Sequence, residues 1–244
     1  GGGRVGDPSA AQNVVQYITI PTAGNAIDFG DLTVARLGVE ACASRTRGVF
    51  MGGRTPTPKD EIDYVTISST GNATDFGNLI ATRQMSGTCS NATRGLNIAG
   101  NDHPSPNNYN RIEYITIAST GNAQDFGDTT GTLYGFGCTA TASSTRGVYA
   151  GAYGAGTNNT IEFVTISTLG NGFDFGDLVK KTYSLVACSN STRGLLAGGS
   201  PGYTTIGYIT LATLGDATDF GALSDGRFEF GATASSVRGV FGGG

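Results

Sequence analysis

The chain lacks tryptophan, has a single histidine and is poor in charge. Only 14% of its 244 residues are charged, and the formal net charge is -4 at neutral pH, with a pI near 4.9. Because nucleic-acid binding needs a surplus of positive charge, we expect no nucleic-acid partner. No apolar run approaches the roughly 20 residues of a membrane-spanning helix, so we also expect no membrane insertion.

Glycine and β-branched residues dominate instead. The chain contains 40 glycines together with many threonines, valines and isoleucines. This composition is typical of short strands joined by tight turns, and no long helical period interrupts it. We therefore expect an all-β chain that forms a single domain over residues 1–244.

One phrase occurs five times, as AGNAIDFG, TGNATDFG, TGNAQDFG, LGNGFDFG and LGDATDFG. Its aspartates are separated by 47, 50, 49 and 45 residues, by subtraction of the positions Asp28, Asp75, Asp125, Asp174 and Asp219. A nearly fixed period of this length indicates a repeat architecture in which each unit is one supersecondary structure. The units cover about residues 2–51, 52–99, 100–150, 151–197 and 198–244.

Each unit predicts four short strands. An alternating segment such as IDYVTI precedes the phrase and has the period of two expected for a strand. A small-residue segment such as SLVACSN and a segment such as VFMGG flank a turn that ends in Arg-Gly, which predicts a hairpin. The fourth strand passes through Asp-Phe-Gly itself. We expect the small-residue strand to be innermost, because crowding near an axis excludes large side chains.

Four antiparallel strands in a unit of this size match one blade of a β-propeller. The five units therefore predict a five-bladed β-propeller. The chain begins with Gly-Gly-Gly and ends with Val-Phe-Gly-Gly-Gly, which is the same phase of the repeat. We predict a closed ring whose last blade combines two strands from residues 228–241 with two from the segment around residues 15–20.

The unit is similar to the kelch repeat. A Gly pair ends one strand, a Tyr-bearing strand follows, and a segment such as VARLG or IATRQ leads into the small-residue strand. Kelch blades carry a tryptophan soon after the tyrosine, whereas this chain has later phenylalanines at Phe29, Phe76, Phe126, Phe175 and Phe220. Gly- and Thr-rich kelch-like arrays resemble parts of phage virion and microbial surface proteins. The resemblance implies a viral or extracellular location and a larger assembly such as a phage tail fibre.

An arginine also recurs in every unit, directly before the glycine of the hairpin. These residues are Arg47, Arg94, Arg146, Arg193 and Arg238. A residue that is present in all blades more often serves the shared scaffold than one ligand, so we expect each arginine to link its blade to the next through a repeated aspartate. An anion-binding ring of arginines is one alternative. A cation held at the Asp-Phe-Gly turns by Asp31, Asn78, Asp128 and Asp177 is another.

Few residues are suited to catalysis or metal binding. The four cysteines form no close-spaced pair, so we expect buried free thiols and no metal site; they are Cys42, Cys89, Cys138 and Cys188. His103 stands in a loop-like run without an evident acid-base partner. We therefore expect no catalytic residue, no cofactor and no enzymatic activity.

The loops that follow the Gly pairs differ from unit to unit, whereas the Arg-Gly hairpins hardly change. Repeat proteins usually place unit-specific insertions on the binding face. We expect a non-enzymatic binding or structural module whose variable loops contact a protein or a glycan through Arg54, His103, Tyr109, Arg111, Tyr153 and Tyr203. The alternatives are a propeller-type glycan-active enzyme, with acidic residues that converge in a pocket, and a pure assembly element without a pocket.

Overall fold

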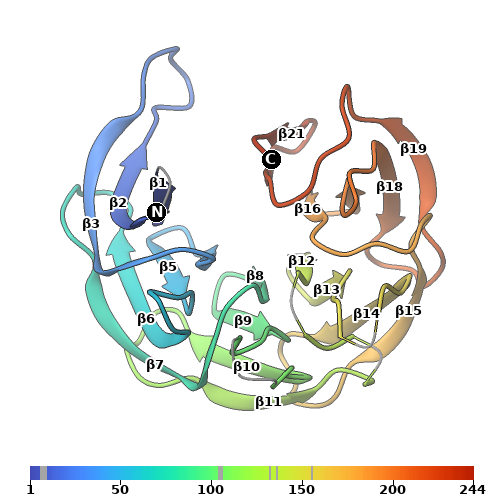
Figure 1. Ribbon diagram of the computed structural model, residues 1–244, viewed down its shortest axis with the longest axis horizontal. Helices are drawn as coiled ribbons and strands as arrows, with labels where there is room; N and C mark the ends of the chain where they lie inside the picture. Colours follow the sequence, from blue (N-terminus) through green and yellow to red (C-terminus); the bar gives the residue numbers. More distant parts are fainter. Residues whose placement is uncertain (6–9, 104–106, 132, 136, 155) are drawn as a thin grey trace.

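The computed structural model describes residues 1–5, 10–103, 107–131, 133–135, 137–154 and 156–244. These residues form 21 strands, and no helix is found among them. All strand pairs are antiparallel, and six sheets follow one another around an open arc (Figure 1). The expected all-β class is therefore confirmed.

Four of the six sheets have four strands each. The first contains β4 (Glu40–Ala43), β5 (Arg47–Met51), β6 (Lys59–Thr66) and β7 (Thr74–Arg83). The second contains β8 (Gly87–Ser90), β9 (Arg94–Ile98), β10 (Arg111–Thr116) and β11 (Gln124–Asp128). The third contains β12 (Thr139–Ala142), β13 (Arg146–Ala150), β14 (Thr160–Thr165) and β15 (Phe173–Asp177). The fourth contains β16 (Val186–Ser189), β17 (Arg193–Ala197), β18 (Thr205–Thr210) and β19 (Thr218–Ala222).

The four strands predicted for each unit are confirmed in these sheets. The small-residue strands β4, β8, β12 and β16 lie toward the middle of the arc and contact one another in sequence (Figure 1). The strands that contain Asp-Phe-Gly form the outer rim. Each sheet thus takes its two inner strands from one unit and its two outer strands from the next, with an edge of small side chains at the centre.

The sheets at the two ends of the arc are incomplete. The N-terminal sheet has three strands, β1 (Gly3–Val5), β2 (Ala10–Tyr17) and β3 (Ile27–Arg36), and the C-terminal sheet has two, β20 (Gly231–Ala234) and β21 (Gly239–Gly242). The prediction of a closed ring with five four-stranded blades therefore differs from the structure. The C-terminal segment does supply two strands, but they belong to a separate sheet from β2, whose edge is paired with β1. The arc stays open between these two sheets (Figure 1).

The repeated Asp-Phe-Gly phrase forms a β-bulge. In the first complete sheet Ile62 is opposite Gly77 and the next residue is opposite Asp75, so Phe76 is an extra residue without a partner across the strands. The same shift occurs in the other complete sheets and between β2 and β3. The bulge re-aims the phenylalanine, whose ring meets the tyrosine of the neighbouring strand edge-on, as in Tyr64 and Phe76 with centroids 5.9 Å apart.

The hydrophobic core is divided among the junctions between neighbouring sheets. Phe76 of β7, for example, belongs to one buried cluster with Ile115 and Ile117 of the next unit. Gly77 completes this junction because it has a φ of +142° and lies directly against the backbone of Gly121. The phrase is thus repeated because every sheet needs the same bulge, aromatic ring and glycine to pack on its neighbour.

All four cysteines are free and buried, as predicted for the thiols. They lie on or beside the small-residue strands that face the middle of the arc. Burial raises the pKa of the Cys42 thiol to about 12 and raises that of Cys89 as well. The thiols therefore stay protonated at neutral pH and behave as small apolar side chains.

Candidate functional site

The variable loops and the Arg-Gly hairpins lie at opposite ends of the strands. β5 begins at Arg47, next to its hairpin, and ends at Met51, next to the loop that follows the Gly pair. The other units repeat this direction, so all variable loops share one face of the arc. Residues 6–9, 104–106 and 155, within three of these loops, lie outside the described residues.

Tyr109 and Arg111 of the predicted binding set lie together, above a buried ion pair. The ring of Tyr109 covers the guanidinium of Arg83, with 5.0 Å between the Arg83 Cζ and the ring centroid. Its hydroxyl donates to Asp102 Oδ2 at 3.3 Å, and burial together with Asp102 raises the pKa of Tyr109. Arg111 Nη1 lies 3.8 Å from Glu113 Oε1, the acid that pairs with Arg83. These two side chains therefore also support the fold.

Tyr153 and Tyr203 lie in the loops of the next two units. The ring of Tyr153 is 36% exposed and packs against Tyr183, with centroids 4.8 Å apart. The Lys180 ammonium lies 4.9 Å from the centre of the Tyr203 ring. Aromatic and cationic groups thus gather on the variable face at this part of the arc.

His103 and Arg54 occupy different surroundings. His103 is exposed, and its backbone carbonyl accepts a 3.3 Å bond from Gln84 Nε2. The backbone of Arg54 forms isolated β-bridges with Leu37 and with Pro58, and the residue lines a cavity in the middle of the arc, which is described below. The structure therefore spreads the six predicted residues over four units of one face, and it places Tyr109 and Arg111 beside the same buried ion pair.

Sequence reasoning missed two buried ion pairs at sheet junctions. Arg36 at the end of β3 pairs with Asp63 of β6, at 2.5 Å, and both side chains are fully buried. Arg83 at the end of β7 pairs with Glu113 of β10 in the same way. In the next junction Glu162 instead accepts bonds from Tyr149 Oη and the Thr130 amide, both at 3.0 Å. The sequence does carry one signal of these pairs, which is an acidic residue inside an otherwise apolar strand segment.

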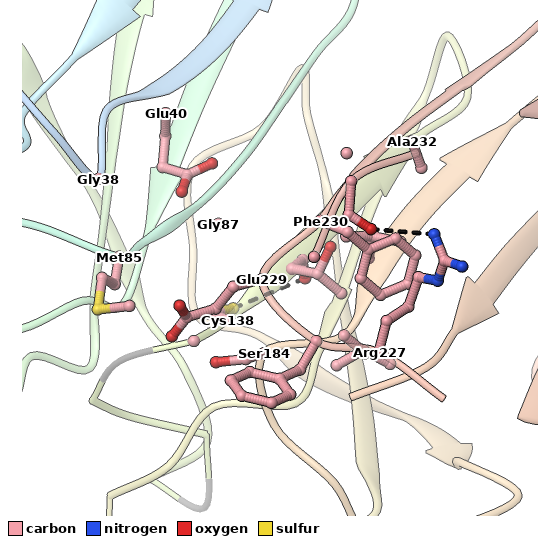
Figure 2. A pocket seen from close by; sticks show the side chains of 18 of the residues that line it. Gly38, Glu40, Met85, Gly87, Cys138, Ser184, Arg227, Glu229, Phe230 and Ala232 are labelled. Atoms are coloured by element: carbon pink, nitrogen blue, oxygen red, sulfur yellow. Dashed lines mark hydrogen bonds between the residues drawn. The ribbon is translucent and has the colours of Figure 1, made fainter. Parts of the chain in front are cut away.

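A cavity of about 1220 Å³ lies in the middle of the arc, between the small-residue strands (Figure 2). Among the carboxylic acids that line it are two from different units, Glu40 at the start of β4 and Glu229 before β20. Burial raises the pKa of Glu40 to about 8. Sequence reasoning missed both of these acids. Each occupies a position of the repeat at which the other four units have an uncharged residue.

The backbone around this cavity adopts a left-handed conformation once in each unit. Gly38, Met85, Gly137, Ser184 and Glu229 all have φ between 53° and 75°. Bonds between these residues link successive units: the Gly137 amide donates to the Met85 carbonyl at 2.9 Å, and the Ser184 amide donates to that of Gly137 at 2.9 Å. A left-handed non-glycine residue is uncommon, so the linked units hold Met85, Ser184 and Glu229 in place.

The repeated arginines on the hairpin face link neighbouring sheets. Arg47 Nη1 donates to the Ile117 carbonyl at 2.9 Å, Arg94 Nη1 to that of Ile166 at 2.8 Å, and Arg146 Nη1 to that of Leu211 at 3.0 Å. The predicted partner was wrong: within the described residues, no ion pair joins one of these arginines to a repeated aspartate. The aspartates are exposed and act locally, as Asp75 Oδ1 accepts from the Gly77 amide at 3.2 Å.

In the part of the chain that the structure describes, no group of three or more His, Cys, Asp or Glu side chains is placed to hold a metal ion. Asp31, Asn78, Asp128 and Asp177, considered above as cation ligands, donate their backbone amides to the Asn or Asp of the next turn. The described part of the chain contains no helix that is long and apolar enough to cross a membrane.

No protein-family model matches the chain, and no curated protein matches it either. The similarity to the kelch repeat therefore stays a prediction from the residue pattern.

Proposed function

We propose that the chain is a kelch-like, five-bladed β-propeller that acts as a non-enzymatic binding module. In this proposal the incomplete sheets at the two ends make up the fifth blade. Four sheets of four strands, each led by a small-residue strand at the centre, support the propeller arrangement. The variable loops then form one face of a rigid scaffold, where recognition residues are usually found.

The contrast between the two faces carries this proposal. On the hairpin face every unit repeats one backbone bond, from the residue three before the arginine to the arginine carbonyl, at 2.8–3.1 Å. On the variable face no loop sequence is shared, and the exposed aromatic and cationic side chains differ from unit to unit. The hairpin face therefore stabilises the scaffold, while the loops of the variable face can differ in sequence to contact a partner.

The tyrosines of the variable face favour a glycan as the partner. Aromatic rings offer apolar faces to sugar rings, and tyrosine loses little conformational entropy on binding. Tyr153, which is partly exposed and held by Tyr183, is the best placed of them. A glycan-binding propeller fits a place in a virion or a cell-surface fibre, as the kelch-like resemblance implies.

Binding to an array of defined oligosaccharides tests this function. We expect the Tyr153→Ala variant to bind its best oligosaccharide at least about tenfold more weakly, because a tyrosine anchor contributes this much or more at a binding centre. Thr145→Ala, at an exposed hairpin position, is the matched control and should bind like the wild type. Equal losses in both variants, or loss only in Thr145→Ala, would contradict the assignment of the face.

A glycan-active enzyme is the second candidate, and one observation favours it. Glu40 and Glu229 line the same cavity, and the raised pKa of Glu40 suits a general acid. The same oligosaccharides, incubated with the protein and analysed for cleavage, separate the two candidates. Cleavage that is lost in Glu40→Gln favours the enzyme, whereas binding without cleavage favours the module.

A further inference from the structure

The two ends of the arc expose the side chains that every internal junction buries. Ile20 is 91% exposed, while its equivalent Ile117 is fully buried. Phe220 is 53% exposed, while its equivalent Phe76 is 2% exposed. Three further apolar residues are also exposed, whereas equivalents such as Ile115 and Val49 are buried; they are Ile18, Ile67 and Val240. These exposed residues are apolar, like the equivalent residues that are buried at the internal junctions. Each end of the arc therefore has side chains suited to a buried surface.

The arginine bonds assign partners across the opening. At three junctions the arginine of one sheet donates to the carbonyl of Ile117 or of its equivalent in the next sheet. The same rule assigns Arg193 to the Ile20 carbonyl and Arg238 to the Ile67 carbonyl. These acceptors belong to two of the exposed isoleucines. In a ring of five units, each of the five repeated arginines therefore has a backbone carbonyl as its acceptor.

The turns before Asp-Phe-Gly give a second, independent rule. The amide of Gly71 donates to the Phe29 carbonyl at 2.7 Å, and Asn72 Oδ1 accepts from the Asp31 amide at 3.1 Å. Equivalent pairs connect the three following junctions. Applied once more, the rule joins the Gly24 amide to the Phe220 carbonyl. The turn at residues 18–27 thus fits against β19.

The strand edges match in the same register. In the first complete sheet Val49 of β5 is opposite Tyr64 of β6, and Met51 is opposite Ile62. The equivalent pairs at the opening are Val240 with Tyr17, and Gly242 with Val15. Among the described residues, β21 pairs only with β20, so its second edge has backbone groups available for β2. An unpaired strand edge of this kind is a template for another strand.

We propose that the two ends of the arc bind each other: β21 pairs along residues 15–19, which comprise the end of β2 and the two residues after it, and the turn at residues 18–27 packs on β19. The occupant of each end is the other end of the same chain, because contact within one chain does not depend on protein concentration, whereas a second copy has to be captured from solution. This closure rests on the five-bladed fold in the proposed function, but it is independent of any ligand.

Residues 1–3 compete with the closed arrangement. The Gly2 amide donates to the Val14 carbonyl at 3.1 Å, as the Gly52 amide does to that of Glu61. Residues 242–244 are equivalent to the segment around Gly52, so they would occupy the position of residues 1–3 once β21 pairs with β2. Closure therefore requires the Gly2 amide to give up its bond to the Val14 carbonyl. The Gly243 amide then donates to that carbonyl instead.

A disulfide tests the register. Gln16 and Phe241 are equivalent to the opposed pair Asp63 and Phe50, so Gln16→Cys with Phe241→Cys should form an internal disulfide under mild oxidation. Peptide mapping by mass spectrometry identifies the link in the monomer. The control pair, Tyr17→Cys with Phe241→Cys, is shifted by one residue, which directs the side chains to opposite faces, and should link at least about tenfold less. No link, or links only between molecules, would overturn the proposal; the latter would indicate strand exchange with a second copy.

Arginine variants test the closure without new cysteines. Arg146 and Arg193 both lie over an aromatic ring, with 4.8 Å to Phe163 and 4.4 Å to Tyr208, so the carbonyl bond is their main difference in the open arc. We expect Arg193→Ala to lower the melting temperature as much as Arg146→Ala does. A lowered melting temperature for Arg146→Ala alone would overturn the proposal. Neither outcome depends on glycan binding, so the failure of the proposed function would be seen separately.

Discussion

Replacing Arg83 by alanine is expected to lower the free energy of unfolding by about 3–5 kcal/mol, because it leaves a buried carboxylate without its partner. Arg83 and Glu113 are fully buried and join two neighbouring sheets. Arg83 Nη1 also donates to the Ala99 carbonyl at 2.9 Å, and Tyr109 packs on the guanidinium. Urea unfolding at neutral pH measures the loss.

The loss should depend on pH. Burial raises the pKa of Glu113 above its ordinary value of 4.5, and Arg83 opposes this rise. Without Arg83 the pKa rises further, so the folded variant binds a proton that the unfolded chain releases. Stability of the variant therefore falls as pH increases from the ordinary pKa through the raised one. We expect a smaller difference from the wild type at about pH 5 than at about pH 8.

Two control variants separate the ion pair from general damage. Arg45→Ala changes an exposed hairpin arginine and should stay within about 0.5 kcal/mol of the wild type. The double variant Arg83→Met with Glu113→Gln removes both charges and should recover much of the loss. A loss below about 1 kcal/mol for Arg83→Ala, or a loss independent of pH, would contradict the role of the pair.

Gly77→Ala is expected to cost about 2–6 kcal/mol, as the sum of about 1–3 for a strained backbone and about 1–3 for overpacking. Gly77 has a φ of +142°, and an added Cβ would lie 2.5 Å from the carbonyl oxygen of Gly121 in the next unit. The two sheets would have to separate to accept it. Thermal and urea unfolding of the purified variant measure the effect.

Gly71→Ala is the matched control. Gly71 has a similar φ of +151°, but an added Cβ meets no atom within 4 Å. This variant should therefore show the backbone strain alone, about 1–3 kcal/mol. Equal losses in the two variants would mean that the close approach between sheets contributes nothing.

The repeat period made most of the local structure predictable. The phrase around Asp75 set the register of the units, and the alternating segments and Arg-Gly turns placed the strands of every complete sheet. Phe76 and Gly77 were recognised as repeated, but their role as a bulge at a sheet junction needed the strand pairing. Local pattern determines elements, whereas the contacts between units depend on how neighbouring sheets are placed.

The partners of the charged residues were less predictable for the same reason. Arg47 was expected to reach an aspartate, but it reaches the carbonyl of Ile117, which is 70 residues away in the sequence. Arg83 and Glu113 are separated by 30 residues and belong to different sheets, so neither strand pattern shows that they meet. Glu40 and Glu229 lie at opposite ends of the chain and share one cavity only because the sheets form an arc. Such pairings follow from the tertiary arrangement.

Hydrogen exchange of the unmodified chain tests most directly whether the five units form one ring. Mass spectrometry of a peptide covering residues 18–27 should show protection equal to that of residues 115–124, where the amides of Gly121 and Ala123 donate across the junction at 2.7 and 2.8 Å. In a ring the amides of Gly24 and Ala26 make the equivalent bonds to β19. Exchange of residues 18–27 at the rate of an unstructured peptide, with residues 115–124 protected, would contradict the ring.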